Sequence, residues 1–152
     1  MTSDVLLSIS GIQTGADMDN HDMNGNEPVE VITPAKYYFK NGKHYLLYDE
    51  ADPEEHAITH TTLKFADRYL SVFRRGETQT QLLIESGRHN VTYYATPFGS
   101  LHIVIDGRQV NVDETDDLIS ARAFYALEIN YEHIADCEVR IRVMPRDAAV
   151  SG

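Results

Sequence analysis

The sequence predicts an all-β protein, a closed antiparallel up-and-down β-barrel of about 8–10 strands with a lipocalin-like architecture. Apolar and polar residues alternate with a period of two in short segments, and residues typical of turns separate these segments. Helical periodicity is hard to find, and almost all connections are short or hairpin-like. A barrel is favoured over a sandwich because strand twist accumulates across so large a sheet, and closure removes the exposed edges that promote aggregation.

The first three strands are predicted around one strong turn. Residues 5–12 form an apolar first strand, and residues 15–28, rich in Asp, Asn and Gly, form a flexible polar loop. Residues 28–39 form the second strand and residues 44–48 the third. Asn41-Gly42 between them is the strongest hairpin signal in the chain, because both central residues of a type I′ turn need a positive φ. We therefore expect these two strands to pair directly.

Three further strands follow an acidic turn. Residues 49–55 hold five carboxylates around a proline and are interpreted as a solvated turn. Residues 57–65 alternate in the manner of a half-buried strand. Residues 69–75 and 78–85 form the next two strands, and Gly76 reverses the chain between them.

The C-terminal half is predicted to contain the last four strands. Residues 89–96 precede Pro97, which cannot donate to a sheet ladder, so the chain breaks or bulges before the strand 98–106. Asp106-Gly107 is interpreted as another turn, and the acidic, aperiodic segment 111–117 as a second loop. The final strands are 118–130 and 137–143, followed by a frayed tail, 145–152.

Composition narrows the class of protein. The 152 residues fit a single domain, 1–152, with the barrel itself at 3–144, and they suffice to bury a core. A formal net charge of −11 and a pI near 4.9 argue against nucleic acid and anionic membrane surfaces as partners. No apolar run is long enough for a transmembrane helix. The single cysteine, Cys137, cannot form an internal disulfide, which favours a cytoplasmic location, and the oligomeric state stays open.

Five short motifs, in their order and spacing, resemble those of a known family. They are Tyr37-Tyr38-x-x-Asn41-Gly42-x-x-Tyr45-Leu46, Thr61-Thr62-Leu63-Lys64, Arg74-Arg75-Gly76, Tyr94-x-Thr96-Pro97-Phe98-Gly99 and Tyr125-x-Leu127. In this pattern, which covers residues 3–144, the chain resembles the YwiB-like family of bacterial calycin-like β-barrel proteins, a domain family of unknown function. The resemblance implies a closed barrel similar to lipocalins and fatty-acid-binding proteins. It implies no catalytic residues, because the family carries no established activity.

Three patterns imitate reactive sites without meeting their requirements. Asn20-x-Asp22-x-Asn24-Gly25 resembles the start of an EF-hand loop, but its twelfth position is Val31, where calcium needs a bidentate Glu. His56 and His60 are i, i+4 on a predicted strand, which places them roughly 13 Å apart, too far to hold one metal ion. Gly99-Ser100-Leu101-His102 lacks the second glycine and the helix of a nucleophile elbow. No metal site, cofactor or catalytic residue is predicted, and enzymatic activity ranks behind ligand binding and protein–protein interaction.

The lumen of the barrel is the remaining candidate site. Alternation turns one of Arg74 and Arg75 inward, where it is either a buried partner of Glu128 or Glu85 or the receptor for a ligand carboxylate or phosphate. The ligand-binding residues we predict are Arg74, Gln81, Tyr93, Glu128 and Arg140. Two functions stay open: binding of a small apolar or anionic ligand in the lumen, or a protein–protein interaction or regulatory module with a filled core.

Overall fold

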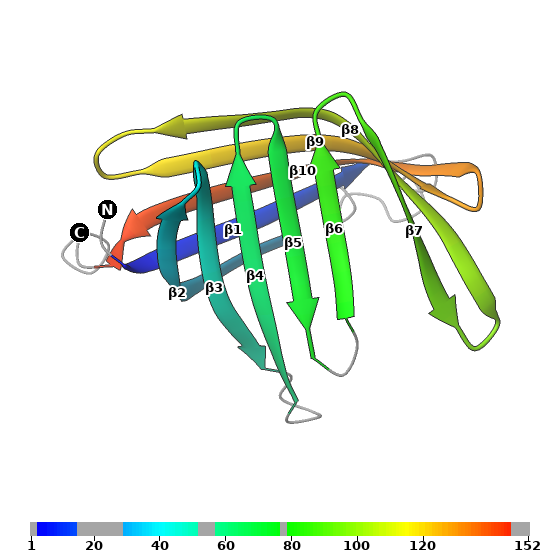
Figure 1. Ribbon diagram of the computed structural model, residues 1–152, viewed down its shortest axis with the longest axis horizontal. Helices are drawn as coiled ribbons and strands as arrows, with labels where there is room; N and C mark the ends of the chain where they lie inside the picture. Colours follow the sequence, from blue (N-terminus) through cyan, green and yellow to red (C-terminus); the bar gives the residue numbers. More distant parts are fainter. Residues whose placement is uncertain (1–2, 15–28, 52–56, 77–78, 147–152) are drawn as a thin grey trace.

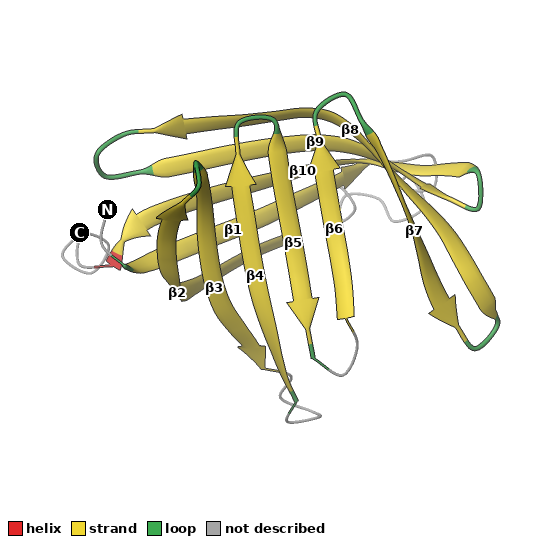
Figure 2. Cartoon of the chain, in the orientation of Figure 1, coloured by secondary structure: helices red, strands yellow, loops and turns green. Residues whose placement is uncertain are grey.

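The computed structural model describes residues 3–14, 29–51, 57–76 and 79–146, and these residues form ten antiparallel strands of one sheet (Figure 1, Figure 2). The strands are β1 (Asp4–Thr14), β2 (Val29–Lys40), β3 (Lys43–Ala51), β4 (Ile58–Ala66), β5 (Tyr69–Arg75), β6 (Gln79–Glu85), β7 (His89–Thr96), β8 (Gly99–Glu114), β9 (Ile119–Ile129) and β10 (Glu132–Pro145). Each strand lies beside its neighbours in the sequence, except that β6 and β7 are the two edges and β1 pairs with β10. The predicted all-β, up-and-down architecture is confirmed. The polar loop 15–28 with its calcium-like motif, and His56, lie outside the described residues.

The barrel is nearly closed where the end of β6 and the turn after it meet β8, at one point that we call the seam. There the Gly87 amide donates to the Gly107 carbonyl oxygen (3.0 Å), and the Gly107 amide donates to the Arg88 carbonyl oxygen (2.9 Å). A Cβ atom on Gly107 would lie 2.0 Å from the carbonyl oxygen of Glu85, at the end of β6. Glycine is therefore required at this position, because any side chain would push β6 and β8 apart.

Beyond the seam, β7 and the first half of β8 form a long hairpin, residues 89–106, which we call the arm (Figure 1). Residues 103–106 at its base still pair with β9, and residues 89–102 extend past that pairing. The pairing of β8 with β9 shifts register between Gly107 and Gln109, which marks a β-bulge at Arg108. Bulges bend a strand and increase its twist. The bulge thus lies at the base of the arm.

Cross-strand neighbours on the inner face of β3 to β6 form three rows. The first row is His44, Phe65, Leu70 and Ile84; the second is Leu46, Leu63, Val72 and Leu82; the third is Tyr48, Thr61, Arg74 and Thr80. The first row and the Leu46–Leu63 half of the second are buried, and the opposite wall contributes buried side chains to the same core, among them Val5, Leu7, Ile141 and Val143. The apolar core therefore fills one end of the barrel, whereas the third row gives the other end a polar lining.

Two predictions about β8 were wrong. Asp106-Gly107 is not a turn, because the strand runs without interruption from Gly99 to Glu114. The predicted loop 111–117 begins inside this strand, and the chain turns only after it, where the Thr115 amide donates to the Leu118 carbonyl oxygen (2.8 Å). The glycine that suggested a turn does not adopt a positive φ and instead permits the close approach at the seam.

The hairpin turns show which local signals were reliable. The turn predicted at Asn41-Gly42 is confirmed, with φ values of 54° and 76°. A second turn with two positive φ values, Asn130-Tyr131 (51° and 69°), joins β9 to β10 and was not predicted. A tyrosine in the left-handed region is an outlier among non-glycine residues, so no residue pattern indicated this turn.

Candidate functional site

A cavity of about 250 Å³ lies at the end of the barrel that carries the polar third row. Both sides of the wall contribute to it: Ile9 of β1 and Val139 of β10 on one side, and side chains of β3 to β6 on the other. The residues that line it are Ile9, Tyr48, Leu63, Val72, Arg74, Thr80, Gln81, Leu82 and Val139. The cavity is thus mostly apolar, with a few polar groups gathered at one end.

Strand register places those polar groups side by side. Tyr48 lies opposite Thr61, Thr61 opposite Arg74, and Arg74 opposite Thr80. Neighbours directly across an antiparallel pair have Cβ atoms roughly 5 Å apart, so the four side chains form a continuous row on the inner face. The second row, one step deeper, supplies the apolar wall.

Arg74 carries a positive charge at the mouth of the cavity. Its Nη2 atom lies 3.5 Å from the Oε1 atom of Glu50, and about half of the Arg74 side chain (51%) is exposed. The partner predicted from the sequence, Glu128 or Glu85, was therefore wrong. Arg74 also interacts with the Tyr48 hydroxyl, and the exposed half of its side chain leaves guanidinium N–H donors available to a ligand or to water.

Tyr48 places a protonated hydroxyl beside this charge. The side chain is buried, and burial, followed by the nearby Glu50 carboxylate, raises the pKa of Tyr48 to about 12. The phenol therefore keeps its proton at physiological pH, and its hydroxyl is hydrogen-bonded with Glu50 and Arg74.

Thr61 carries a buried hydroxyl that has no hydrogen-bond partner within the described part of the chain. The residue is 1% exposed and lies in the third row between Tyr48 and Arg74. A buried polar group without a partner costs about 1–3 kcal/mol. Its row neighbours Tyr48 and Arg74 line the cavity, so a water or ligand group in the cavity is one explanation for this hydroxyl.

The other end of the lumen is closed by His44. The Tyr37 hydroxyl and His44 Nδ1 are 2.8 Å apart, and the His44 ring stacks on Phe65 with centroids 5.0 Å apart. Burial lowers the pKa of His44, partly offset by the carboxylate of Glu114, whose Oε2 atom lies 3.9 Å from His44 Nε2. The imidazole is therefore a neutral part of the apolar plug.

The structure separates the five residues predicted to bind a ligand. Arg74 and Gln81 line the cavity. Tyr93 is 69% exposed on the arm, and Glu128 lies on β9, paired with Val104 and His133. The structure thus brings Arg74 and Gln81 together at the cavity and places Tyr93 and Glu128 away from it.

Arg140, the fifth predicted residue, lies on the outer face of β10. It pairs with Arg122 across the strands, and the carboxylate of Glu138 bridges both, 2.6 Å from Arg140 Nε and 2.9 Å from Arg122 Nη2. Burial acts to raise the pKa of Glu138, but the hydrogen bonds from the two arginines outweigh it and hold the pKa below its usual range. This group balances like charges on the outer wall, away from the lumen.

Sequence reasoning did not identify Tyr48, Thr61 and Thr80 as members of the site. Alternation showed on which face of its strand each residue lies, but a single strand does not show which residues of other strands lie beside it. The signal appears only when three cross-strand registers are combined, and register cannot be read from a single strand.

No group of three or more His, Cys, Asp or Glu side chains in the described part of the chain is arranged to hold a metal ion. His60, which the sequence singled out, lies 2.7 Å from Asp49 on the surface, an ordinary ion-pair geometry. No helix among the described residues has the length and apolar character needed to cross a bilayer.

The fold and cavity define a ten-stranded, nearly closed antiparallel barrel with a small internal site. Residues 12–141 match the family described as Domain of unknown function (DUF1934), and the chain belongs to that family. The crystal structure of ywiB protein from Bacillus subtilis is similar in fold, with a TM-score of 0.63 and 19% sequence identity over 91% of this chain and 90% of that chain. The resemblance to the YwiB-like family is thus confirmed. No curated protein matches the chain.

Proposed function

We propose that this protein binds a small molecule in the lumen of the barrel, a largely apolar molecule with one polar or anionic group. The observation that carries the proposal is the cavity of about 250 Å³, whose apolar walls end at the half-exposed guanidinium of Arg74. Ligand sites in proteins are typically mostly apolar, with a few polar groups that fix orientation. By fold-level analogy, lipocalin-like barrels of this size hold one small ligand.

The arrangement of polar groups supports one orientation of the ligand. Its apolar part lies between Ile9, Val139 and Leu63, and its polar group faces Arg74. The Thr61 hydroxyl, which has no partner among the described residues, gains one if the ligand or a water bound with it reaches the third row. The volume lies just below the roughly 300–1,000 Å³ typical of drug-sized sites, so the ligand is small.

Native mass spectrometry of the protein purified from its own host tests this proposal, with a denatured sample as the control. A non-covalent mass that disappears on unfolding supports lumen binding and gives the ligand class. A bare mass under several growth conditions counts against it.

A titration with the fluorescent probe anilinonaphthalene sulfonate, which is apolar and anionic, tests the site itself. Arg74→Gln should weaken binding about tenfold to a hundredfold, because charge-assisted hydrogen bonds contribute about 1.5–3 kcal/mol. Arg75→Gln is the matched control, since Arg75 is exposed on the other face of the same strand. Equal affinities of the two variants would contradict the role of Arg74.

A second function, a protein–protein interaction or regulatory module, is favoured by one specific observation. The arm exposes apolar side chains outside the lumen, among them Val91 and Phe98. We also propose that the protein works in the cytoplasm, because its single cysteine allows no internal disulfide.

A further inference from the structure

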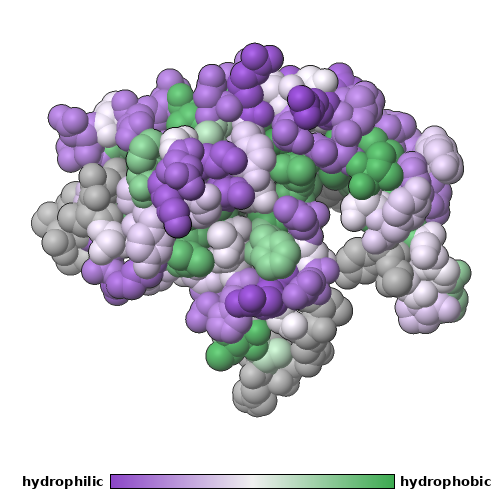
Figure 3. Space-filling view, in the orientation of Figure 1, coloured by the Kyte–Doolittle hydropathy of each residue, from purple (hydrophilic) through white to green (hydrophobic). Residues whose placement is uncertain are grey.

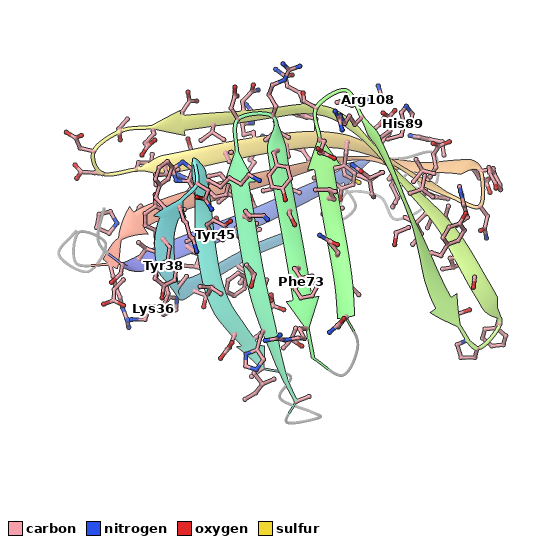
Figure 4. The ribbon with its side chains drawn as sticks, viewed as in Figure 1. Lys36, Tyr38, Tyr45, Phe73, His89 and Arg108 are labelled. Carbon is pink, nitrogen blue, oxygen red and sulfur yellow. The ribbon has the colours of Figure 1, made fainter. Side chains whose placement is uncertain are left out.

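The arm differs in composition from the rest of the chain. Residues 90–105 contain no Asp, Glu, Lys or Arg, although these residues make up 24% of the sequence. Charged groups stop at its base, where the Asp106 carboxylate lies 3.5 Å from His89 Nε2 and 3.1 Å from Arg108 Nε; His89 and Arg108 are labelled there in Figure 4. The arm is an uncharged hairpin on a protein with a net charge of −11.

Apolar and aromatic side chains of the arm face solvent. Val91 is 53% exposed, Tyr93 69% and Phe98 99%. In the space-filling view the arm, at the right, carries mainly pale and green atoms, whereas the deep purple of charged residues gathers on the barrel (Figure 3). Exposed apolar side chains also occur on β2 and β3, such as Ile32 and Phe39, but on the arm they coincide with a stretch that has no charged residue. This combination points to a contact surface.

The outer face of the arm is held in place by the β9–β10 turn. The His102 ring stacks on Tyr131 (centroids 4.5 Å apart) and meets the edge of Tyr93 (5.3 Å). Asn130 joins the same group, because its Oδ1 atom accepts from the His102 amide (2.9 Å) and its amide donates to the His102 carbonyl oxygen (2.7 Å). The left-handed conformation of Tyr131 thus brings its ring onto the arm. These contacts within one chain hold the arm in place without a partner.

β7 is also an edge strand without the usual protection. It pairs with β8 on one side and has no strand on the other among the described residues. Native proteins normally guard such edges with charged side chains, because a free edge is a template for another strand. Residues 90–96 of β7 carry no charged side chain.

We propose that β7 pairs antiparallel with β7 of a second copy of this chain, forming a two-fold symmetric dimer through the arms. The charge distribution favours a second copy as the partner. Two copies of a protein with a net charge of −11 repel each other over most of their surface. Residues 90–105 of the arm carry no charged side chain, so two copies can approach there with the least repulsion. A basic partner would find no carboxylate on residues 90–105. A strand paired antiparallel with itself also satisfies the self-complementarity that a two-fold interface demands.

Sedimentation velocity of the full chain, from low-micromolar to near-millimolar concentration, tests the dimer. We expect a reversible species of twice the 17.2-kDa chain mass. Val91→Lys should weaken dimerisation about tenfold or more, because it brings two like charges into the interface. Ile32→Lys, on a similarly exposed aliphatic residue of β2, is the matched control and should leave dimerisation unchanged. Both sites are exposed, so both variants should fold.

Hydrogen exchange at low and high concentration locates the contact. Amides of β7 should exchange more slowly at high concentration, and those of β6, the other edge strand, should not change. A monomer at every concentration, equal dimerisation of the two lysine variants, or slowed exchange at β6 in place of β7 would each overturn the proposal.

Discussion

Gly107→Ala adds one methyl group at the seam, and the distances there predict how much the free energy of unfolding falls. The new Cβ atom would lie 2.0 Å from the carbonyl oxygen of Glu85, 2.8 Å from its carbonyl carbon and 3.0 Å from its nitrogen. All three are backbone atoms, so no side-chain rotation relieves the clash, and β6 and β8 must separate. The hydrogen bonds that Gly107 makes with Gly87 and Arg88 would then lengthen or break.

The free energy of unfolding should fall by about 3–5 kcal/mol in this variant. Two backbone hydrogen bonds contribute about 1 kcal/mol each, and overpacking of a well-packed site costs about 1–3 kcal/mol. Gly11→Ala is the matched control, because Gly11 also lies in a strand but its Cβ would meet only the Glu138 carbonyl oxygen at 3.8 Å. That variant should be unchanged or more stable by about 0.4–1 kcal/mol, since alanine restricts the unfolded chain.

Urea unfolding followed by circular dichroism and tyrosine fluorescence measures both variants, since the chain has nine tyrosines and no tryptophan. The reasoning predicts a large loss for Gly107→Ala and none for Gly11→Ala. A loss below about 0.5 kcal/mol in Gly107→Ala would show that β6 and β8 do not approach closely in solution, and the seam would have to be abandoned.

Two further predictions concern the two ends of the lumen. Burial lowers the pKa of His44 in the folded state, so below the unfolded value of about 6.5 the unfolded chain binds more protons, and the free energy of unfolding falls as the pH drops toward the folded pKa. His44→Phe should lose part of this acid sensitivity, measured by urea titrations near neutral pH and near pH 5.5. An unchanged pH dependence in this variant would contradict the prediction. Thr61→Val removes the buried hydroxyl that has no partner among the described residues and should raise the free energy of unfolding by about 1–3 kcal/mol while weakening probe binding in the cavity; a loss of stability would show that the hydroxyl is satisfied in the folded protein.

Local signals in the sequence predicted the strands well, and long-range signals were missing. Asn41-Gly42 specified its hairpin because the information lies within two residues. Gly107 was misinterpreted as a turn because the atom that requires a glycine there belongs to Glu85, which no local pattern connects to it. The same limit explains the partner of Arg74: alternation turned its side chain inward, but only the strand order places Glu50 beside it.

Two of the predicted site residues could have been excluded by the alternation of apolar and polar residues along their strands. Arg140 lies between Val139 and Ile141, which both face the core, so the period of two places Arg140 outside. Glu128 has the same position between two partly buried apolar neighbours. Tyr93 could not have been placed, because nothing in β7 indicates that the strand leaves the barrel. The face of the sheet on which a side chain lies is therefore predictable from sequence, whereas the strand that lies opposite it across the lumen is not.

The cavity and the arm have one structural cause. At Gly107 β8 meets the end of β6, and beyond this point β8 pairs with β7 on one side while its pairing with β9 ends at Ile103. β6 is thereby left as an edge, and its Gln81 and Leu82 line the open side of the cavity. A change at the seam should therefore disturb both probe binding and dimerisation. Arg74→Gln should affect only the first and Val91→Lys only the second, so the three variants together separate the two proposals from the fold on which both depend.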